Sequence, residues 1–438
     1  MTDCTEGKLE FLPSCGKKVE AEFCDKEITS DAGLVLVREI DAAVGFTESI
    51  SQIIPDNRKQ SLVTHSIKTM LQQRIYGICL GYEDVNDHHV LRHDPMLQIA
   101  ADQNAALASS STLCRFENNI TLKTCADMHI PILWQFVKSY KKAPNEIVFD
   151  FDPTDDEVHG NQENNHYHGY YKHDCFLPLK VFCGDHLLVS YLRPSNIDPA
   201  KHVGAILCLL VKYIRQFWPR TKIIFRADGG LCRDHILRWC ERNNIHYIVG
   251  FSKNNRLNIK AKGLMARAAL EYEKTGIKQK LYDQTYYSAH SWKGSNRKVV
   301  FKVEYGEKGD NLRFIITTLN KLPENAYKFY SMRGDMENRI KELKLECYSG
   351  RTSCHRWSAN QFRLLLSSFA YVLLNAVRNI GLAKTELKNA SCSTIRTTLL
   401  KVGAVITRSC RRIHIAMAKH FVKKEAFSSA AKAITAYG

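Results

Sequence analysis

The chain has 438 residues, of which 45% are hydrophobic and 24% charged, the composition of an ordinary globular protein long enough for two or more domains. Lysine and arginine number 62 against 45 aspartate and glutamate, and the net charge of +17 favours a polyanionic partner, with nucleic acid ahead of a membrane surface. The 15 cysteines are scattered and include no CxxC pair, which argues against a disulfide framework.

The most apolar stretch of the chain predicts a buried helix. Residues 364–377 are bounded by Arg363 and Arg378 and are too short to span a bilayer, so we expect no membrane contact. The first residues lack the basic and apolar segments of an export signal. A cytoplasmic protein is therefore expected.

Residues 1–140 are predicted to form a helical N-terminal region. Residues 1–30 are mixed and polar, and we expect a loosely ordered start there. In residues 32–46 and 62–82, apolar side chains recur at intervals of three and four, the spacing of amphipathic helices.

Residues 141–255 predict an α/β core. "EIVFDFDPT" (146–154) alternates as a strand does, and residues 175–194 read as two strands joined at the Gly184–Asp185 turn. Beyond them helix and strand alternate, in the order helix 201–219, strand 221–228, helix 230–244 and strand 246–253.

The rest of the chain predicts an insertion and a helical end. Residues 256–323 begin with a basic helical piece and then become strand-like, which favours a β-strand-rich insertion in the α/β core. Residues 324–356 predict the last helix of the core. Residues 357–438 predict a basic helical C-terminal region.

Carboxylates stand at the ends of two predicted strands. Asp150 and Asp152 are two residues apart on the first strand and so point to one face, while Asp228 ends the strand "TKIIFRAD". If these strands are neighbours, the acids meet at one edge of the sheet. Converging carboxylates repel one another unless a cation lies between them, and Mg²⁺ or Mn²⁺ prefers such oxygen ligands. Taken alone, Asp228 is better explained as the cap of the following helix.

A third acidic position lies in "YSMRGDMENRIKELK" (330–344). On a helix, Tyr330, Arg333, Glu337, Lys341 and Lys344 form a single stripe. The stripe is also what a solvated face with i,i+4 ion pairs would show.

Two other groups of residues are weaker candidates for a site. "HGNQENNHYHGYYKHDC" (159–175) holds several histidines and a cysteine, but no spacing in it is that of a structural zinc site. "TRSCRRIHIAMAKHFVKK" (407–424) combines basic and apolar positions, and its Arg411 and Arg412 are candidates for contact with phosphate.

Together these motifs resemble those of the DDE transposases of bacterial insertion sequences. The resemblance is closest to the insertion sequence 1380 group, which is itself similar to the piggyBac transposases. It rests on "DPT" (152–154), "ADGG" (227–230) and the pattern Tyr-x₂-Arg-x₃-Glu-x₆-Lys from Tyr330 to Lys344. Flanking stretches such as "LRPSNID" and "RTSCHRWSANQ" fit as well, and the resemblance spans residues 30–420.

The resemblance implies a ribonuclease-H-like catalytic core with its β insertion between the second and third acids. It implies Asp152, Asp228 and Glu337 as catalytic and metal-binding residues. Asp150 competes for the first position and Glu342 for the third. Asp152 is preferred because the threonine of the family motif follows it at Thr154.

The resemblance also implies cofactors and partners. Two Mg²⁺ ions, for which Mn²⁺ can substitute, would activate the attacking oxygen and stabilise the leaving one. The partners would be the terminal inverted repeats of the element and target DNA, with a homodimer holding two ends near the bacterial nucleoid, and with the N-terminal region serving DNA binding or dimerisation. The expected DNA contacts are Tyr330, Arg333, Lys341, Lys344, Arg411 and Arg412.

The function implied is cut-and-paste transposition: cleavage at the element ends and joining of the 3′-hydroxyls to target DNA. Two alternatives keep the same motifs. One is a nuclease of this fold without strand transfer, and the other is a catalytically inactive, domesticated DNA-binding protein.

Overall fold

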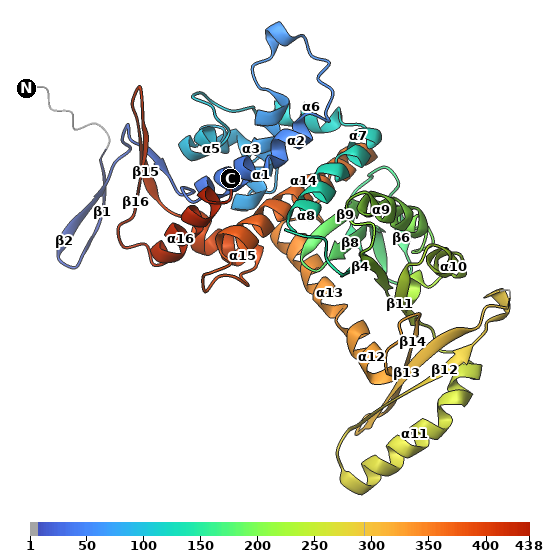
Figure 1. Cartoon of the computed structure of the whole chain (residues 1–438). Helices are drawn as coiled ribbons and strands as arrows, with labels where there is room; N and C mark the ends of the chain where they lie inside the picture. Colours follow the sequence, from blue (N-terminus) through green and yellow to red (C-terminus); the bar gives the residue numbers. More distant parts are fainter. Residues whose placement is uncertain (1–7, 293) are drawn as a thin grey trace, which may run out of the picture.

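The structure is a computed structural model and describes residues 8–292 and 294–438. Figure 1 shows three parts: a helical body that contains the C-terminus, a central sheet flanked by α9 (Val203–Phe217) and α10 (Asp234–Arg242), and a lobe. The lobe is formed by α11 (Asn255–Thr275), β12 (Gln279–Tyr287), β13 (Arg297–Gly306) and β14 (Gly309–Thr317). Helices α12 (Pro323–Ser331) and α13 (Gly334–Lys341) run from this lobe back toward the body (Figure 1).

The N-terminal region is mostly helical but begins with strands. The expectation of a loosely ordered start is wrong for residues 9–29, because apolar residues alternate there and pair across strands, with Leu9 opposite Ala21 and Phe11 opposite Val19. The strands are β1 (Leu9–Ser14), β2 (Lys17–Ala21) and β3 (Glu27–Thr29). The helices that follow are α1 (Leu34–Val44), α2 (Phe46–Ser51), α3 (Ile67–Leu80), α4 (His88–Leu91), α5 (Pro95–Ala100), α6 (Ser110–Asn118), α7 (Leu122–Asp127) and α8 (His129–Lys138).

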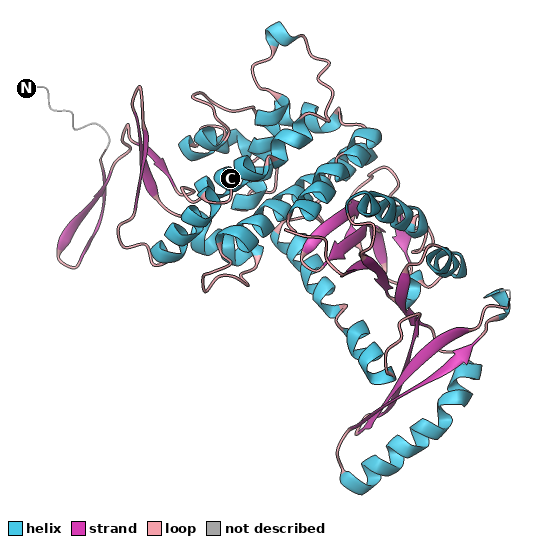
Figure 2. Cartoon of the chain, in the orientation of Figure 1, coloured by secondary structure: helices cyan, strands magenta, loops and turns pink. Residues whose placement is uncertain are grey.

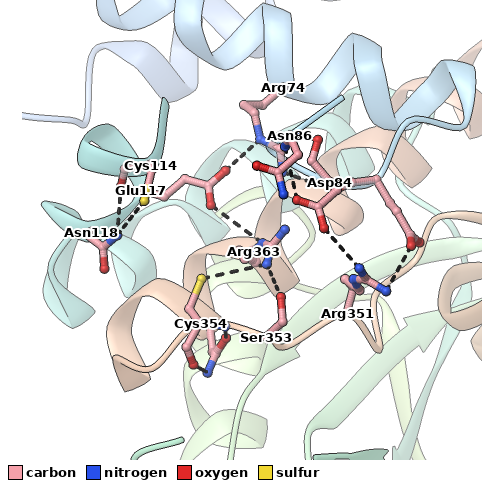
Figure 3. A network of polar contacts seen from close by, with 12 residues as sticks. Arg74, Asp84, Asn86, Cys114, Glu117, Asn118, Arg351, Ser353, Cys354 and Arg363 are labelled. Atoms are coloured by element: carbon pink, nitrogen blue, oxygen red, sulfur yellow. Dashed lines mark hydrogen bonds and ion pairs between the residues drawn. The ribbon is translucent and has the colours of Figure 1, made fainter. Parts of the chain in front are cut away.

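A buried ionic network ties the helical body to the segment that leads out of the core (Figure 3). Glu117 of α6 accepts from Arg74 of α3 at 2.6 Å and lies 3.6 Å from Arg363 of the long helix α14 (Trp357–Ala376). Arg363 in turn donates to the Ser353 hydroxyl at 2.5 Å. Because these charges are buried, removing one partner would leave another without compensation.

The central sheet has the strand order of a ribonuclease-H-like core. Its five core strands run in the order β9-β8-β4-β10-β11, with β8 antiparallel to both neighbours and β4, β10 and β11 parallel. Their bounds are β4 (Glu146–Pro153), β8 (Leu179–Cys183), β9 (His186–Tyr191), β10 (Lys222–Ala227) and β11 (His246–Phe251). The predicted fold class is confirmed.

The core strands are apolar because helices cover them. Phe149, Phe151 and Phe225 are fully buried, in a cluster with side chains of α9 (Val203–Phe217) and α10 (Asp234–Arg242). Parallel strands covered in this way carry near-continuous apolar runs, which is the pattern of "KIIFRA" in β10.

Residues 256–323 extend this sheet instead of forming a sheet of their own. Strand β14 (Gly309–Thr317) pairs with β11, and β13 (Arg297–Gly306) and β12 (Gln279–Tyr287) follow, so the sheet has eight strands. The segment begins with α11 (Asn255–Thr275), a 21-residue helix that contacts β12 and β13. Figure 2 shows these long strands continuing from the core sheet into the lobe.

The last catalytic-core helix is broken into pieces. The chain forms α12 (Pro323–Ser331), α13 (Gly334–Lys341) and a π-helical turn over Glu342–Glu346. It then enters α14, which is long and apolar enough to cross a membrane by composition, but 78% of its most apolar 18-residue window is buried in the protein. α14 is therefore a central core helix.

The C-terminal region was predicted to be helical, but part of it forms strands. Strands β15 (Ala404–Arg408) and β16 (Ile413–Met417) form a hairpin that pairs with β3. Ala404 and Ile406 are buried while Val405 and Thr407 are exposed, so the apolar positions follow the two-residue period of a strand. The helices in this region are α14, α15 (Cys392–Ile395) and α16 (Lys424–Thr435).

Candidate active site

Two of the predicted acids lie at the same level on neighbouring central strands. β10 pairs with β4 in parallel, and the register places Ala227 opposite Phe151. Asp228 is the residue after Ala227, and Asp152 is the residue after Phe151. Because the carboxyl ends of parallel strands meet at one edge, the two side chains face the same open end of the sheet.

Asp150 lies one layer below them and is paired. Its carboxylate accepts two hydrogen bonds from Arg226 of β10, at 2.5 Å and 2.8 Å. Arg226 also donates to the carbonyl of Phe329 at 2.7 Å, and both charged side chains are buried. The bidentate ion pair joins β10 to β4, and the bond to Phe329 fastens α12 to these central strands.

Glu337 reaches the same edge through Arg333. Arg333 lies in the break between α12 and α13 and donates to Asp152 at 2.7 Å and to Glu337 at 2.6 Å. The Asp152 and Arg333 side chains are each 14% exposed, whereas Glu337 is 51% exposed. The structure therefore brings Asp152, Asp228 and Glu337 to one site, with a guanidinium between the first and third acids.

The electrostatics of the site are those of crowded carboxylates. Burial raises the pKa of Asp152 to about 7, with Arg333 opposing the shift and the charges of Asp228 and Glu337 adding to it. Burial lowers the pKa of Arg333, but the acids around it, Asp152 and Asp228 among them, leave it above its usual value. A site with this balance stabilises added positive charge.

Tyr330 packs against the turn that carries Asp228. A side chain on Gly250 of β11 would come within 2.7 Å of the Gly229 nitrogen and 2.8 Å of the Tyr330 hydroxyl. Burial raises the pKa of Tyr330, and Asp228 and Asp152 reinforce this shift. Asp228 also accepts from the backbone N–H of Leu231 at 3.2 Å, so it caps the following turn while facing the site.

The two lysines of the predicted stripe lie in different places. Lys344 donates to the carbonyl of Asp155 at 2.5 Å and lies 3.5 Å from its carboxylate, just beyond the end of β4. Lys341 is exposed and makes no ion pair with any described residue. The break at residues 332–333 and the π-helical turn place these side chains on different faces, so a single straight helix is the wrong description of residues 330–344.

Glu342 is buried in a separate network. It pairs with Arg378 at 2.8 Å and with Arg339 at 2.6 Å, and it accepts from the backbone N–H of Cys392 at 2.7 Å. Possible ligand atoms of Glu342, Glu346 and Cys392 lie within 4.8 Å of one another. The carboxylates there are already engaged, with Glu346 accepting from Ser393, so this cluster is a helix cap between charged partners.

The histidine-rich segment folds into a small sheet beside the acids. Strands β5 (Asp156–Glu157), β7 (His173–Phe176) and β6 (His166–His168) pair antiparallel. None of its histidines belongs to a metal-ligand group within the residues that the structure describes.

Arg411 and Arg412 are exposed in the turn of the β15–β16 hairpin.

The site has a donor set that suits a hard divalent cation. Asp152, Asp228 and Glu337 supply carboxylate oxygens from a strand end, a turn and a helix, and burial, reinforced by the other two acids, destabilises Asp152 as an anion. Mg²⁺ is bound in proteins by a few carboxylates, with water and substrate phosphate completing its shell. The residues present therefore fit such an ion.

Comparison with known proteins decides the family. The model of the family described as transposase DDE domain group 1 matches residues 11–438. The chain belongs to this family. A search of curated proteins finds no match.

Among solved structures, the chain is similar to piggyBac transposase in a cryo-EM structure of its synaptic complex with hairpin DNA. The identity is 9% and the TM-score 0.44, with 86% of this chain and 82% of that chain covered. The family makes the chain a DDE-type transposase, and the acid cluster is its candidate active site.

Some residues that lie against the site or its supports were not identified from the sequence, namely Arg226, Gly250, Asp155 and Tyr171. His173, which the sequence offered only as a weak metal-ligand candidate in the histidine-rich segment, lies against Asp155. Arg226 precedes Asp228 by two residues, just as Asp150 precedes Asp152. This shared spacing could have predicted that Arg226 and Asp150 form a buried pair.

Proposed function

We propose that this protein is a cut-and-paste transposase of the insertion sequence 1380 group. It binds the terminal inverted repeats of its element, cleaves at the element ends and joins the 3′-hydroxyls to target DNA. The observation that carries the proposal is the meeting of Asp152, Asp228 and Glu337 at the open end of β4 and β10. The motifs around these acids are those on which the resemblance to the group rests.

Each acid has a distinct setting in this proposal. Asp152 sits on the central strand of a rigid sheet, Asp228 on a capped turn, and Glu337 on a more exposed helix. Asp152 serves as the first acid instead of Asp150, because Asp150 is already neutralised by Arg226. Glu337 serves as the third instead of Glu342, which is held by Arg378.

Two Mg²⁺ ions, or Mn²⁺ in their place, would be held by the three acids and would activate the attacking oxygen and stabilise the leaving oxygen of the phosphodiester. The chain itself positions the DNA. Arg333 and Lys344 neutralise phosphate, and the Tyr330 hydroxyl lies beside the Asp228 turn. Lys341, Arg411 and Arg412, all exposed, contact the backbone farther out. A homodimer holds the two ends together.

A cleavage and joining assay tests the proposal. The purified protein is incubated with Mg²⁺, a labelled duplex carrying the element end, and a supercoiled target plasmid. Cleavage followed by joined product is expected. Cleavage without joining would identify a nuclease, and binding without cleavage would identify an inactive DNA-binding protein.

Variants assign the acids in the same assay. Asp152→Asn, Asp228→Asn and Glu337→Gln should each reduce cleavage on the order of 10³-fold or more while DNA binding persists. Near-normal cleavage by any of them would remove that residue from the catalytic set.

A further inference from the structure

An aromatic turn stands directly beside the acid cluster. The turn His168–His173, of sequence HGYYKH, joins β6 to β7, and β7 pairs with β5, which begins four residues after Asp152. His173 Nε2 lies 3.5 Å from the Asp155 carboxylate, and the Asp155 carbonyl accepts from Lys344. The turn is thus linked both to the end of β4 and to the helical segment that carries Glu337.

The two tyrosines of the turn occupy different environments. The Tyr171 ring lies 4.8 Å from the ring of His168 and 6.0 Å from that of His173. Burial raises the pKa of Tyr171 to about 12, and the charges of Asp155 and Asp152 add to the shift. Tyr170 packs edge-on against Tyr171 at 5.1 Å but is 82% exposed.

The base of the hairpin is held firmly while its tip is open. The Ser195 hydroxyl donates to the His166 carbonyl at 2.7 Å, and the backbone N–H of Trp357 donates to Glu163 at 2.8 Å. At the tip, the N–H of Lys172 donates to the His168 carbonyl at 2.8 Å, and Lys172 itself has a φ of 63° and is exposed. The fixed base presents the Tyr170 ring and the Lys172 ammonium to solvent, on a turn whose His173 lies 3.5 Å from the Asp155 carboxylate.

An exposed ring, a lysine and phenolic and imidazole groups within six residues match the chemistry of an unpaired nucleotide. A base stacks on an aromatic ring whatever its sequence, and a neighbouring cation contacts the phosphate. We propose that the aromatic turn holds an unpaired nucleotide of the DNA end at the active site, with Tyr170 stacking on the base and Lys172 contacting the adjoining phosphate. This inference rests on the proposed function, because it assigns the turn to the same DNA end.

A binding experiment tests the turn without requiring catalysis. The full chain, without divalent metal, is titrated into two labelled duplexes of arbitrary sequence, one blunt and one with unpaired terminal nucleotides that include 2-aminopurine. The wild type should prefer the unpaired end and change the 2-aminopurine fluorescence. Tyr170→Ala should reduce the preference for the unpaired end over the blunt end about tenfold, because stacking contributes an effect of this size. The variant should also abolish the fluorescence change.

Controls separate stacking from other roles. Tyr170→Phe should behave as the wild type, and so should Tyr167→Ala, which removes another exposed tyrosine of the same hairpin, outside the turn. Unchanged preference and fluorescence in Tyr170→Ala would overturn the proposal. If Lys172→Ala weakened binding to both duplexes equally and Tyr170→Ala had no effect, phosphate contact alone would explain binding and the proposal would be overturned. Because any sequence serves as probe, the stacking result stands or falls separately from cleavage of the element end.

Discussion

Arg333 donates a hydrogen bond to Asp152 at 2.7 Å, across 181 residues of sequence, and holds Glu337 with its other terminal nitrogen at 2.6 Å. One side chain therefore links the central strand β4 to helix α13. The oxygens that it binds are those that would ligate a divalent cation. Arg333 would consequently compete with such a cation for the carboxylate oxygens of Asp152 and Glu337.

Replacing Arg333 should strengthen metal binding in the absence of DNA. Arg333→Gln removes a competing charge, and we expect Mn²⁺ to bind about tenfold more tightly or more, since a charge-assisted hydrogen bond contributes about 1.5–3 kcal/mol and each 1.4 kcal/mol is a factor of ten. Titration calorimetry with Mn²⁺ measures this. Arg339→Gln is the matched control, because Arg339 lies on the same helix and pairs with Glu342. An Mn²⁺ affinity that is unchanged or weaker in Arg333→Gln would contradict the competition.

Asp150 and Asp152 should respond oppositely to the same substitution. Asp150→Asn leaves Arg226 buried without its counter-ion and should lower the free energy of unfolding by about 2–4 kcal/mol. Asp152→Asn removes a charge that its surroundings disfavour, so the free energy of unfolding should rise by about 1 kcal/mol or more. Urea unfolding at pH 8 without divalent metal measures both. The assignment fails if both variants are destabilised alike.

The difference between wild type and Asp152→Asn should depend on pH. The pKa of Asp152 is raised from 3.8 to about 7 on folding, so the folded state binds more protons than the unfolded state between these values. The stability of the wild type relative to the variant should therefore fall as the pH rises through this window and level off above it. Unfolding midpoints across the window measure the trend, and a constant difference would exclude the raised pKa.

Glu342 should contribute to the stability of the fold and not to metal binding. Glu342→Gln leaves Arg378 without its buried partner and should lower the free energy of unfolding by about 3 kcal/mol, with no change in Mn²⁺ affinity. Thermal unfolding and Mn²⁺ titration of the variant, done well below its midpoint, separate the two effects. Loss of Mn²⁺ binding with normal stability would instead make the cluster of Glu342, Glu346 and Cys392 a metal site.

The tip of the β15–β16 hairpin should contribute salt-dependent DNA affinity. Arg411→Ala and Arg412→Ala should each weaken binding to all sequences alike and reduce the slope of log affinity against log salt by about 1. Fluorescence anisotropy at several salt concentrations measures the slope. Lys68→Ala, which removes a lysine paired with Glu48, should leave it unchanged. A wild-type slope in both hairpin variants would rule out these contacts.

The sequence by itself determined the elements that carry the acids. Apolar alternation placed β4 and a continuous apolar run placed β10, and the positions of Asp152 and Asp228 at their ends followed from where these apolar patterns stop. Such local signals are strong because buried parallel strands tolerate few polar residues. The hairpins at residues 9–21 and 404–417 were missed, since exposed strands carry short and weak alternation.

Only the tertiary structure decided which partners each acid meets. Asp150 and Glu342 are held in buried pairs by Arg226 and Arg378 from distant segments. Asp152 and Glu337 instead share Arg333 at the open end of the sheet. The reason is physical: the pKa and the reactivity of a carboxylate depend on burial and on charges a few ångströms away, and those neighbours are set by packing, not by sequence distance.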